Sequence, residues 1–316
     1  MNPKITPKNP QLSVIMPVYN AGPHLAEAIE SILKQTFTDY ELIIINDGST
    51  DNTADIIGRI KDRRVRVMSQ KNRGLVASLN RGIKASKGRY VARMDADDIS
   101  LPHRFSKQMS YLSHNKEVVL LGSSYSEIDH KSNRGSNVPV IEDDGDLRRE
   151  MYFKNPFGHG TTMMKVDAVK QAGGYDQAYW PAEDYDLWRR LAKLGKIANI
   201  NEVLYLYRLN QDGISAQNLL PQAKKVDLIR KEIWSRQQYK NESVVGVLRS
   251  LRSSDRTNND KKWHFRIELA SYLWRPHRAQ ALVNIVALVL PDIVRPRRLL
   301  GMFKEFRSNL YQYDSN

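Results

Sequence analysis

The sequence contains no cysteine among its 316 residues. This absence excludes disulfide bonds, iron–sulfur clusters, thiolate nucleophiles and zinc sites built on cysteine. The seven histidines are scattered along the chain, and no two of them stand at a spacing typical of metal ligands. If the protein binds a metal ion, carboxylate side chains must therefore supply the protein ligands.

Long apolar segments are missing as well. The first 11 residues are polar and proline-rich, without the apolar core of a secretory signal. The longest apolar stretch, residues 279–290, is interrupted by Gln280 and Asn284 and is shorter than the ~20 residues that cross a bilayer. We therefore expect a cytoplasmic protein with no secretory signal and no transmembrane helix.

Positive charge is abundant but unevenly distributed. The chain has 49 basic and 35 acidic residues, a formal net charge of +14. Such a surplus is typical of proteins that meet phosphate groups in nucleic acids, nucleotides or anionic lipids. Residues 1–218 carry 30 basic and 26 acidic side chains, whereas residues 219–316 carry 19 and 9. The surplus therefore belongs mainly to the C-terminal third.

The first third of the chain alternates short apolar runs with amphipathic segments, which predicts a mostly parallel sheet with helices on both faces. Strands are predicted at residues 12–18, 41–45, 65–68, 90–94 and 118–121. Residues 131–146, rich in Asn, Gly, Ser and acid, predict a long loop. We expect an α/β domain over residues 1–218 and a basic helical extension over residues 219–316.

Polar loops follow three of the predicted strands, at residues 19–22, 46–51 and 95–98. In sheets of this kind, ligands bind beyond the carboxyl ends of the strands. Asp47 directly follows a buried strand, where its carboxylate can accept a hydrogen bond from a nucleotide base. The same loop also has ordinary turn chemistry, with Gly48 permitting the turn and Asp51 capping the next helix.

Asp95, Asp97 and Asp98 place three carboxylates within four residues at the end of a strand. Their mutual repulsion is costly unless a cation or a basic partner offsets it. Hard oxygen ligands suit Mg²⁺ or Mn²⁺, ions that often take their remaining ligands from water and a substrate diphosphate. The alternative is a solvated acidic turn that caps the next helix.

Taken in order, several segments resemble the family-2 glycosyltransferases of GT-A fold, and the resemblance covers nearly all of residues 12–215. The segments that carry it are residues 13–20, 46–51, 72–75, 80–83, 87–90, 93–98, 173–176 and 182–188. The resemblance implies a Rossmann-like α/β fold and the transfer of a sugar from a nucleotide-sugar to a hydroxyl group.

The resemblance also implies roles for single residues. By analogy with the family, Asp95 lies near the ribose, and Asp97 binds the Mg²⁺ or Mn²⁺ that bridges the diphosphate. Asp98 either assists the metal or caps a helix that begins near Leu101. The residues implied to hold the nucleotide are Pro17, Val18, Tyr19, Asn20 and Asp47.

An inverting transfer needs one general base to accept the proton of the attacking hydroxyl. The family places this base in an acidic pair, here Glu183 and Asp184, with Asp184 as the expected base. The pair opens a predicted helix, whose dipole stabilises carboxylates, so both residues are alternatively helix stabilisers. This position predicts a lowered carboxylate pKa and a base of modest strength, leaving most of the catalysis to positioning and the metal.

Three further residues are candidate substrate contacts, each with a structural alternative. His159 either bonds to the substrate or closes a turn, and Trp188 either lines the acceptor site or lies in the core. Arg208 either approaches the leaving diphosphate or forms a surface ion pair. Arg93 and Arg104 flank the acidic loop and are expected to offset its charge.

The C-terminal third contains two apolar stripes at helical spacing, with basic residues beside them. The stripes are formed by residues 282, 285, 286 and 289 and by residues 299, 302, 303, 306 and 310. Such helices lie in the interface of an anionic membrane, or pack on the α/β domain or on a second copy of the chain. We expect peripheral attachment at the inner face of the cytoplasmic membrane, with a homo-oligomer as the alternative use.

The hypothesis is thus an inverting, metal-dependent glycosyltransferase that moves a sugar from a UDP-sugar to a glycan or lipid-linked oligosaccharide in polysaccharide synthesis. One alternative is a sugar nucleotidyltransferase, which would show a glycine-rich phosphate loop with Arg or Lys after the first strand; residues 19–23 do not form one. Another is a basic nucleic-acid-binding protein. The aromatic residues of the C-terminal third form no obvious stacking platform, so no nucleic acid is expected as a partner.

Overall fold

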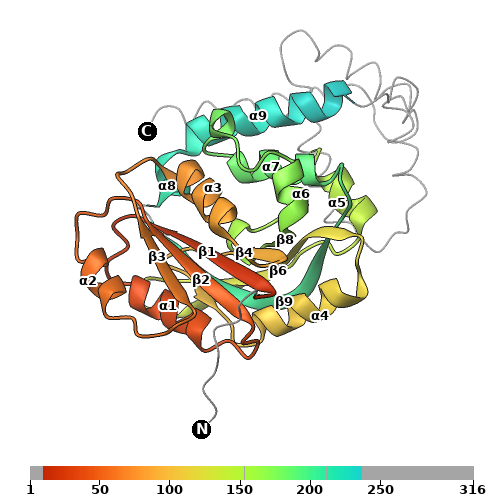
Figure 1. Cartoon of the computed structure of the whole chain (residues 1–316). Coiled ribbons are helices and arrows are strands. Elements are labelled where there is room, and N and C mark those ends of the chain that lie inside the picture. Colours follow the sequence, from red (N-terminus) through yellow and green to blue (C-terminus); the bar gives the residue numbers. More distant parts are fainter. Residues whose placement is uncertain (1–9, 153, 211–212, 237–316) are drawn as a thin grey trace, which may run out of the picture. The chain divides into compact units, whose positions relative to one another are not determined.

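The computed structural model describes residues 10–152, 154–210 and 213–236. Within these residues, nine strands form one mixed sheet in the order β3-β2-β1-β4-β8-β6-β9-β5, and β7 pairs with β6. Four adjacent strands are parallel to one another: β1 (Leu12–Val18), β2 (Tyr40–Asn46), β3 (Val65–Ser69) and β4 (Tyr90–Arg93) (Figure 1). This arrangement confirms the predicted α/β class.

Buried strands fill two cores, one on each face of the sheet. In β1, Ile15 faces the core under α3 (Leu75–Ala85), whereas Val14 and Met16 face the core under α1 (Leu25–Leu33). Because successive side chains of a strand point to opposite faces, a strand covered on both sides is apolar throughout. The continuous apolar run of β1 has this origin.

The remaining helices of the first half also cover the sheet. α4 (Arg104–His114) contributes Phe105 and Leu112 to the core that α1 borders. The short α2 (Thr53–Gly58) buries Ile57 in the same core. Helices therefore lie on both faces, as the sequence pattern predicts.

The second half of the sheet is mixed. β6 (Val118–Ile128) pairs in parallel with β9 (Lys196–Arg208) and antiparallel with β8 (Met163–Lys165). The two-residue β5 (Ile99–Ser100) pairs with the end of β9. β9 thereby brings Arg208 beside the acidic loop that follows β4.

The prediction of a long loop over residues 131–146 is wrong. This segment contains β7 (Arg134–Val138), which pairs antiparallel with β6, and the start of α5 (Asp144–Glu150). Four of the five residues of β7 are exposed. Main-chain pairing with β6 therefore defines β7. A strand of this kind shows no apolar pattern in the sequence.

Helices α6 (Val166–Gln171), α7 (Glu183–Leu191) and α9 (Leu219–Arg236) share one face of the sheet with α3 (Figure 1). Two 3₁₀ turns, at His159–Thr161 and Gln177–Tyr179, precede α6 and α7. The short α8 (Ile214–Gln217) leads into α9.

Helix α9 begins the predicted basic extension, and it belongs to the compact unit that ends at Arg236. Ile229 is fully buried in the core beside α7. The two apolar stripes predicted for membrane or subunit contact fall in residues 237–316, outside the described residues. None of the helices in the described part of the chain combines the length and the apolar character that a membrane span requires.

Candidate active site

The loops after β1 and β2 are bound to each other at the carboxyl edge of the sheet. Asn20 takes a left-handed backbone conformation, with φ at 48°, and its N–H donates to Ser49 Oγ at 3.1 Å. Thr50 N in turn donates to Asn20 Oδ1 at 2.8 Å. Asp51 accepts hydrogen bonds from Gly22 N at 3.1 Å and Thr53 N at 3.0 Å, as expected of a structural residue.

Asp47 is buried at the same edge, and its carboxylate holds the start of α3. Oδ1 accepts from Gln70 Nε2 at 2.6 Å and Arg73 N at 2.9 Å, and Oδ2 accepts from Gly74 N at 2.8 Å. The next residue is Gly48, with φ at +77°, and a Cβ there would stand 2.7 Å from a backbone nitrogen of the facing loop. Only glycine allows this approach. Asp47 thus has a structural role in addition to its predicted hydrogen bond with the nucleotide base.

The other predicted nucleotide residues differ in exposure. Tyr19 is 51% exposed and Asn20 is also exposed, so both side chains are open to a ligand. Pro17 is partly buried. Val18 is 1% exposed, and its carbonyl accepts from Asp47 N at 2.8 Å. The side chain and carbonyl of Val18 therefore serve the fold.

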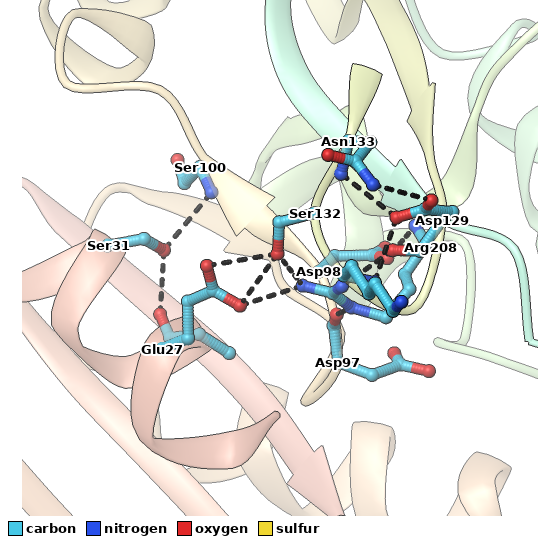
Figure 2. A network of polar contacts seen from close by, with 11 residues as sticks. Glu27, Ser31, Asp97, Asp98, Ser100, Asp129, Ser132, Asn133 and Arg208 are labelled. Atoms are coloured by element: carbon cyan, nitrogen blue, oxygen red, sulfur yellow. Dashed lines mark hydrogen bonds and ion pairs between the residues drawn. The ribbon is translucent and has the colours of Figure 1, made fainter. Parts of the chain in front are cut away.

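The acidic loop after β4 is held by Arg208, which lies at the end of β9 (Figure 2). The buried guanidinium donates from Nε to Asp97 O at 2.7 Å and from Nη1 to Asp129 O at 2.8 Å. Its Nη2 contacts Glu27 Oε2 at 2.8 Å and Ser132 Oγ at 3.1 Å. Arg208 therefore forms an ion pair, as one of the two alternatives expects, and its partner Glu27 is 44% exposed, but the guanidinium itself is buried in this network.

The carboxylates of Asp97 and Asp98 have different surroundings. Asp98 is 1% exposed, and its Oδ1 accepts from Arg208 N at 2.7 Å. Burial, and then the charge of Asp97, raise the pKa of Asp98 to about 7. Asp98 does not cap the next helix, since α4 begins at Arg104 with no side-chain cap. The Asp97 carboxylate points away from the Arg208 network (Figure 2) and is partly exposed, with Asn210 Nδ2 at 3.5 Å.

Two further arginines fix the end of β4. Arg93 is buried and forms an ion pair with the Asp95 carboxylate, and Asp95 N donates to the Tyr205 hydroxyl at 3.2 Å. Arg104 is fully buried and donates to Arg93 O at 3.0 Å and Thr162 O at 3.3 Å. Burial lowers the pKa of Arg104 to about 10. Arg104 therefore orders the backbone as well as offsetting charge.

The second acidic group, Glu183 and Asp184, begins α7 as predicted. Asp184 Oδ2 accepts from Asn155 Nδ2 at 2.8 Å, and Oδ1 accepts from Tyr185 N at 2.6 Å. Burial, and then the charge of Asp184, raise the pKa of Glu183 to about 7, and burial also raises the pKa of Asp184. The predicted lowering of these pKa values by the helix dipole is wrong, because burial outweighs it.

Arg93 connects the two acidic groups electrostatically. Its positive charge lowers the pKa of Asp98 in the first group and the pKa of both Glu183 and Asp184 in the second. Charges interact measurably only over short distances in a protein. The buried guanidinium of Arg93 therefore influences carboxylates of both groups, although burial raises their pKa values overall.

Comparison with known proteins shows the family of the chain. The sequence model for "Glycosyl transferase family 2" matches residues 13–173. The chain belongs to this family. The match decides against the nucleotidyltransferase alternative.

Relatives of the glycosyltransferase come from several bacteria. The putative glycosyltransferase EpsE of Bacillus subtilis is 35% identical over 217 residues, which cover 66% of this chain and 77% of EpsE. The amylovoran biosynthesis glycosyltransferase AmsE of Erwinia amylovora is 35% identical over 210 residues, or 64% and 78% of the two chains. An uncharacterized glycosyltransferase of Haemophilus influenzae is 34% identical over 238 residues, or 71% and 73%.

Among solved structures, S. aureus TarS 1–349 in complex with UDP-GlcNAc superimposes with a TM-score of 0.57 at 19% identity, covering 74% of this chain and 75% of TarS 1–349. The complex of the same fragment with UDP gives a TM-score of 0.56 at 20% identity, covering 73% of each chain. These matches confirm the GT-A fold.

His159 and Trp188 pack together beside the second acidic group of the glycosyltransferase. His159 Nε2 lies 2.8 Å from the Tyr175 hydroxyl, and its ring centroid is 5.8 Å from that of Trp188. Burial and the charge of Arg93 hold the pKa of His159 well below its usual range, so the ring is neutral. Trp188 is fully buried against Phe157. The structure therefore places Trp188 in the core and not on an acceptor surface.

A cleft of ≈ 650 Å³ in the glycosyltransferase is lined in part by Tyr175. It runs between α3 and the turn after α6, with Arg73, Asn80 and Arg190 among its polar lining. Asn80 donates to Tyr175 O at 2.8 Å and accepts from Tyr175 N at 2.9 Å, which fixes this wall. No carboxylate of either acidic group lines the cleft.

Sequence reasoning missed two supporting residues of the glycosyltransferase. Asn155 contacts Asp184 from 29 positions earlier in the chain, and Glu27 contacts Arg208 across 181 positions. Asn155 precedes a proline, and Glu27 lies on an ordinary amphipathic helix. Neither residue has a local signal that distinguishes it from a solvent-exposed polar residue.

Proposed function

We propose that this glycosyltransferase transfers a sugar from a UDP-sugar to an acceptor hydroxyl with inversion at the anomeric carbon, assisted by Mg²⁺ or Mn²⁺. One observation supports the proposal: the chain has two acidic groups with different partners, and the charge of the buried Arg93 influences carboxylates of both. One group suits a metal and a diphosphate, and the other suits a base.

The donor is expected at the loops after β1, β2 and β4. Tyr19 and Asn20 are exposed there, and Asp47 and Asp95 are the further candidates for the nucleoside. TarS, which has the same fold, was crystallised with UDP-GlcNAc. We therefore assign a UDP-sugar as the donor.

The residues present fit a hard divalent cation. In the described part of the chain, no three His, Asp or Glu side chains form a metal-binding group. The partly exposed Asp97 carboxylate would instead bind an ion that completes its coordination with water and the donor diphosphate. When bound, such an ion neutralises the charge that develops on the leaving diphosphate.

Asp184 is the proposed base. Asn155 Nδ2 and Tyr185 N fix its two carboxylate oxygens, so the side chain has a defined direction. Burial raises the pKa of Asp184, which makes the ionised form a stronger proton acceptor than an exposed aspartate. It accepts the proton of the acceptor hydroxyl as that oxygen attacks the sugar. Glu183, with a pKa of about 7, is the neighbouring candidate for an acceptor contact.

The acceptor that we propose is a glycan or lipid-linked oligosaccharide of a surface polysaccharide. The name of AmsE assigns that relative to amylovoran biosynthesis, and EpsE is a further bacterial relative. The surplus of basic residues after position 218 supports attachment to an anionic membrane, where a lipid-linked acceptor is held. Pairing with a second copy of the chain is the alternative use of this region.

A donor screen tests the proposal. Thermal unfolding is measured with UDP-, GDP- and dTDP-sugars, each with and without Mn²⁺, because a bound ligand raises apparent stability with its occupancy. We expect stabilisation by a UDP-sugar that depends on Mn²⁺, and release of UDP from that donor. Stabilisation by no nucleotide-sugar, or equal stabilisation without the metal, would contradict the assignment.

A further inference from the structure

Helix α9 packs along α7, the helix that begins with the acidic pair (Figure 1). Ile229 of α9 is fully buried in the same core as Tyr185 and Trp188, and Val226 and Ile233 pack against that core. α9 lies well beyond residue 173, where the family match ends. Helix α9 therefore covers the helix that carries the proposed base.

One carboxylate joins the two helices. Glu232 Oε1 accepts from the Tyr179 hydroxyl at 2.8 Å, and Glu232 Oε2 lies 2.8 Å from Arg189 Nη2. Arg189 is buried, and the same nitrogen contacts Asp186 Oδ1 at 2.6 Å. The Arg189 guanidinium also stacks 5.1 Å from the ring centre of Tyr179. Glu232 therefore binds both α7 and the turn that precedes it.

A second contact comes from the start of α9. Gln222 Nε2 donates to Pro181 O at 3.1 Å. Gln222 and Glu232 are ten residues apart, about 15 Å along a helix. α9 therefore contacts Tyr179 and Pro181, which lie shortly before the start of α7, and Arg189 within α7. The start of α7 is held from outside the site.

We propose that Glu232 is a positioning residue for sugar transfer, which acts on Glu183 and Asp184 through Tyr179 and Arg189. The inference rests on the proposed function, since it assumes that Asp184 is the base. Without the Glu232 carboxylate, Asp186 still pairs with Arg189, so α7 remains folded. The segment before α7 loses an anchor, and displacement of a reacting group by about 1 Å is enough to reduce a rate about a hundredfold.

The test compares Glu232→Gln with Glu202→Gln in the full chain. Glu202 is a matched control, because it is a glutamate ion-paired with Lys107 that contacts neither α7 nor α9. UDP affinity with Mn²⁺ is measured by calorimetry, and kcat and KM are measured for release of UDP from UDP-GlcNAc. For Glu232→Gln we expect kcat to fall about tenfold or more, with KM and UDP affinity within about twofold of wild type. Glu202→Gln should change none of the three.

A second variant keeps the test valid if Glu232→Gln folds poorly. Tyr179→Phe removes one hydroxyl and should lower kcat in the same direction. The double variant should lose less than the sum of the two effects, because both act through one contact. An unchanged kcat in Glu232→Gln, or equal losses of kcat and UDP affinity, would overturn the role of Glu232. A wild-type chain that releases UDP from no UDP-sugar would instead overturn the proposed function, and this inference with it.

Discussion

Each acidic group contains one buried carboxylate, but the two groups are held by opposite kinds of partner. In the loop after β4, Arg93 pairs with Asp95, and Arg208 binds the backbone of Asp97 and the carboxylate of Asp98. At the start of α7, the partners of Asp184 are the neutral donors of Asn155 and Tyr185.

The difference explains what each group can do. In each group, burial raises the pKa of one carboxylate to about 7, that of Asp98 and that of Glu183. Burial by itself therefore does not distinguish the roles of the two acidic groups. Direct contacts with arginine fix the loop and leave Asp97 directed outward, ready for a cation. In the second group, burial raises the pKa of Asp184 although its two neutral donors lower it, and the resulting proton affinity suits a base.

The largest expected effect is that of Asp97→Ala, which removes the outward carboxylate of the first group. We expect sugar transfer to fall at least about a thousandfold, because the developing charge on the diphosphate is no longer neutralised. Mn²⁺-dependent binding of UDP, measured by calorimetry, should be lost as well. Asp146→Ala is the control, since Asp146 is an exposed partner of Arg149 on α5. Near-normal sugar transfer by Asp97→Ala would show that Asp97 does not bind the catalytic metal ion.

The next effect concerns the base. Asp184→Asn keeps an oxygen that accepts from Asn155 but removes the proton acceptor. We expect transfer to fall by about two to four orders of magnitude, while UDP affinity with Mn²⁺ stays close to wild type. Loss of UDP binding together with transfer would show that Asp184 is not simply the base. The proposed division of roles between the two acidic groups would then be wrong, because both groups would bind the nucleotide-sugar donor.

The sequence predicts the sheet and the acidic groups because both leave local patterns. β1 and β2 are buried on both faces and read as apolar runs, and the polar residues that follow them mark the edge where ligands bind. β7 leaves no such pattern, because four of its five residues are exposed and its main chain alone defines it. A strand of this kind is visible only once β6 is in place.

The partners of the acidic groups are not predictable from local patterns. Arg208 reads as an exposed residue at a strand end, yet its guanidinium contacts positions 27, 97, 129 and 132. The pKa of Asp184 moves against the helix dipole because tertiary packing buries the start of α7. Long-range contacts therefore decide what the locally visible carboxylates do.

Arg208→Lys is expected to have an intermediate effect on Mn²⁺ binding. It tests whether contacts with arginine position Asp97 in the first acidic group. Lysine keeps the charge but cannot reach the separate acceptors that the planar guanidinium joins. Looser support of the Asp97 backbone should weaken Mn²⁺ binding by about ten- to a hundredfold. Mn²⁺ titration of UDP binding measures this, with the exposed Arg149→Lys as the control. An unchanged Mn²⁺ requirement would show that the network does not position Asp97.

The smallest expected effect is a shift of pH dependence in the second group. A base works in its ionised form, so the transfer rate should rise with pH through the pKa of Asp184 and level off above it. The hydrogen bond from Asn155 lowers this pKa, and Asn155→Ala should therefore raise it. We expect the rise in rate to move to higher pH, with a nearly unchanged plateau.

Asn133→Ala is the matched control for this shift, because Asn133 donates to Asp129 beside the first group. Profiles of kcat against pH for the two variants separate the groups directly. A midpoint that moves only in Asn155→Ala places the titrating base at the start of α7. A midpoint that moves in Asn133→Ala, or that stays fixed in Asn155→Ala, would place the rate-determining titration elsewhere. The neutral hydrogen bond from Asn155 would then serve to orient Asp184 without setting its proton affinity.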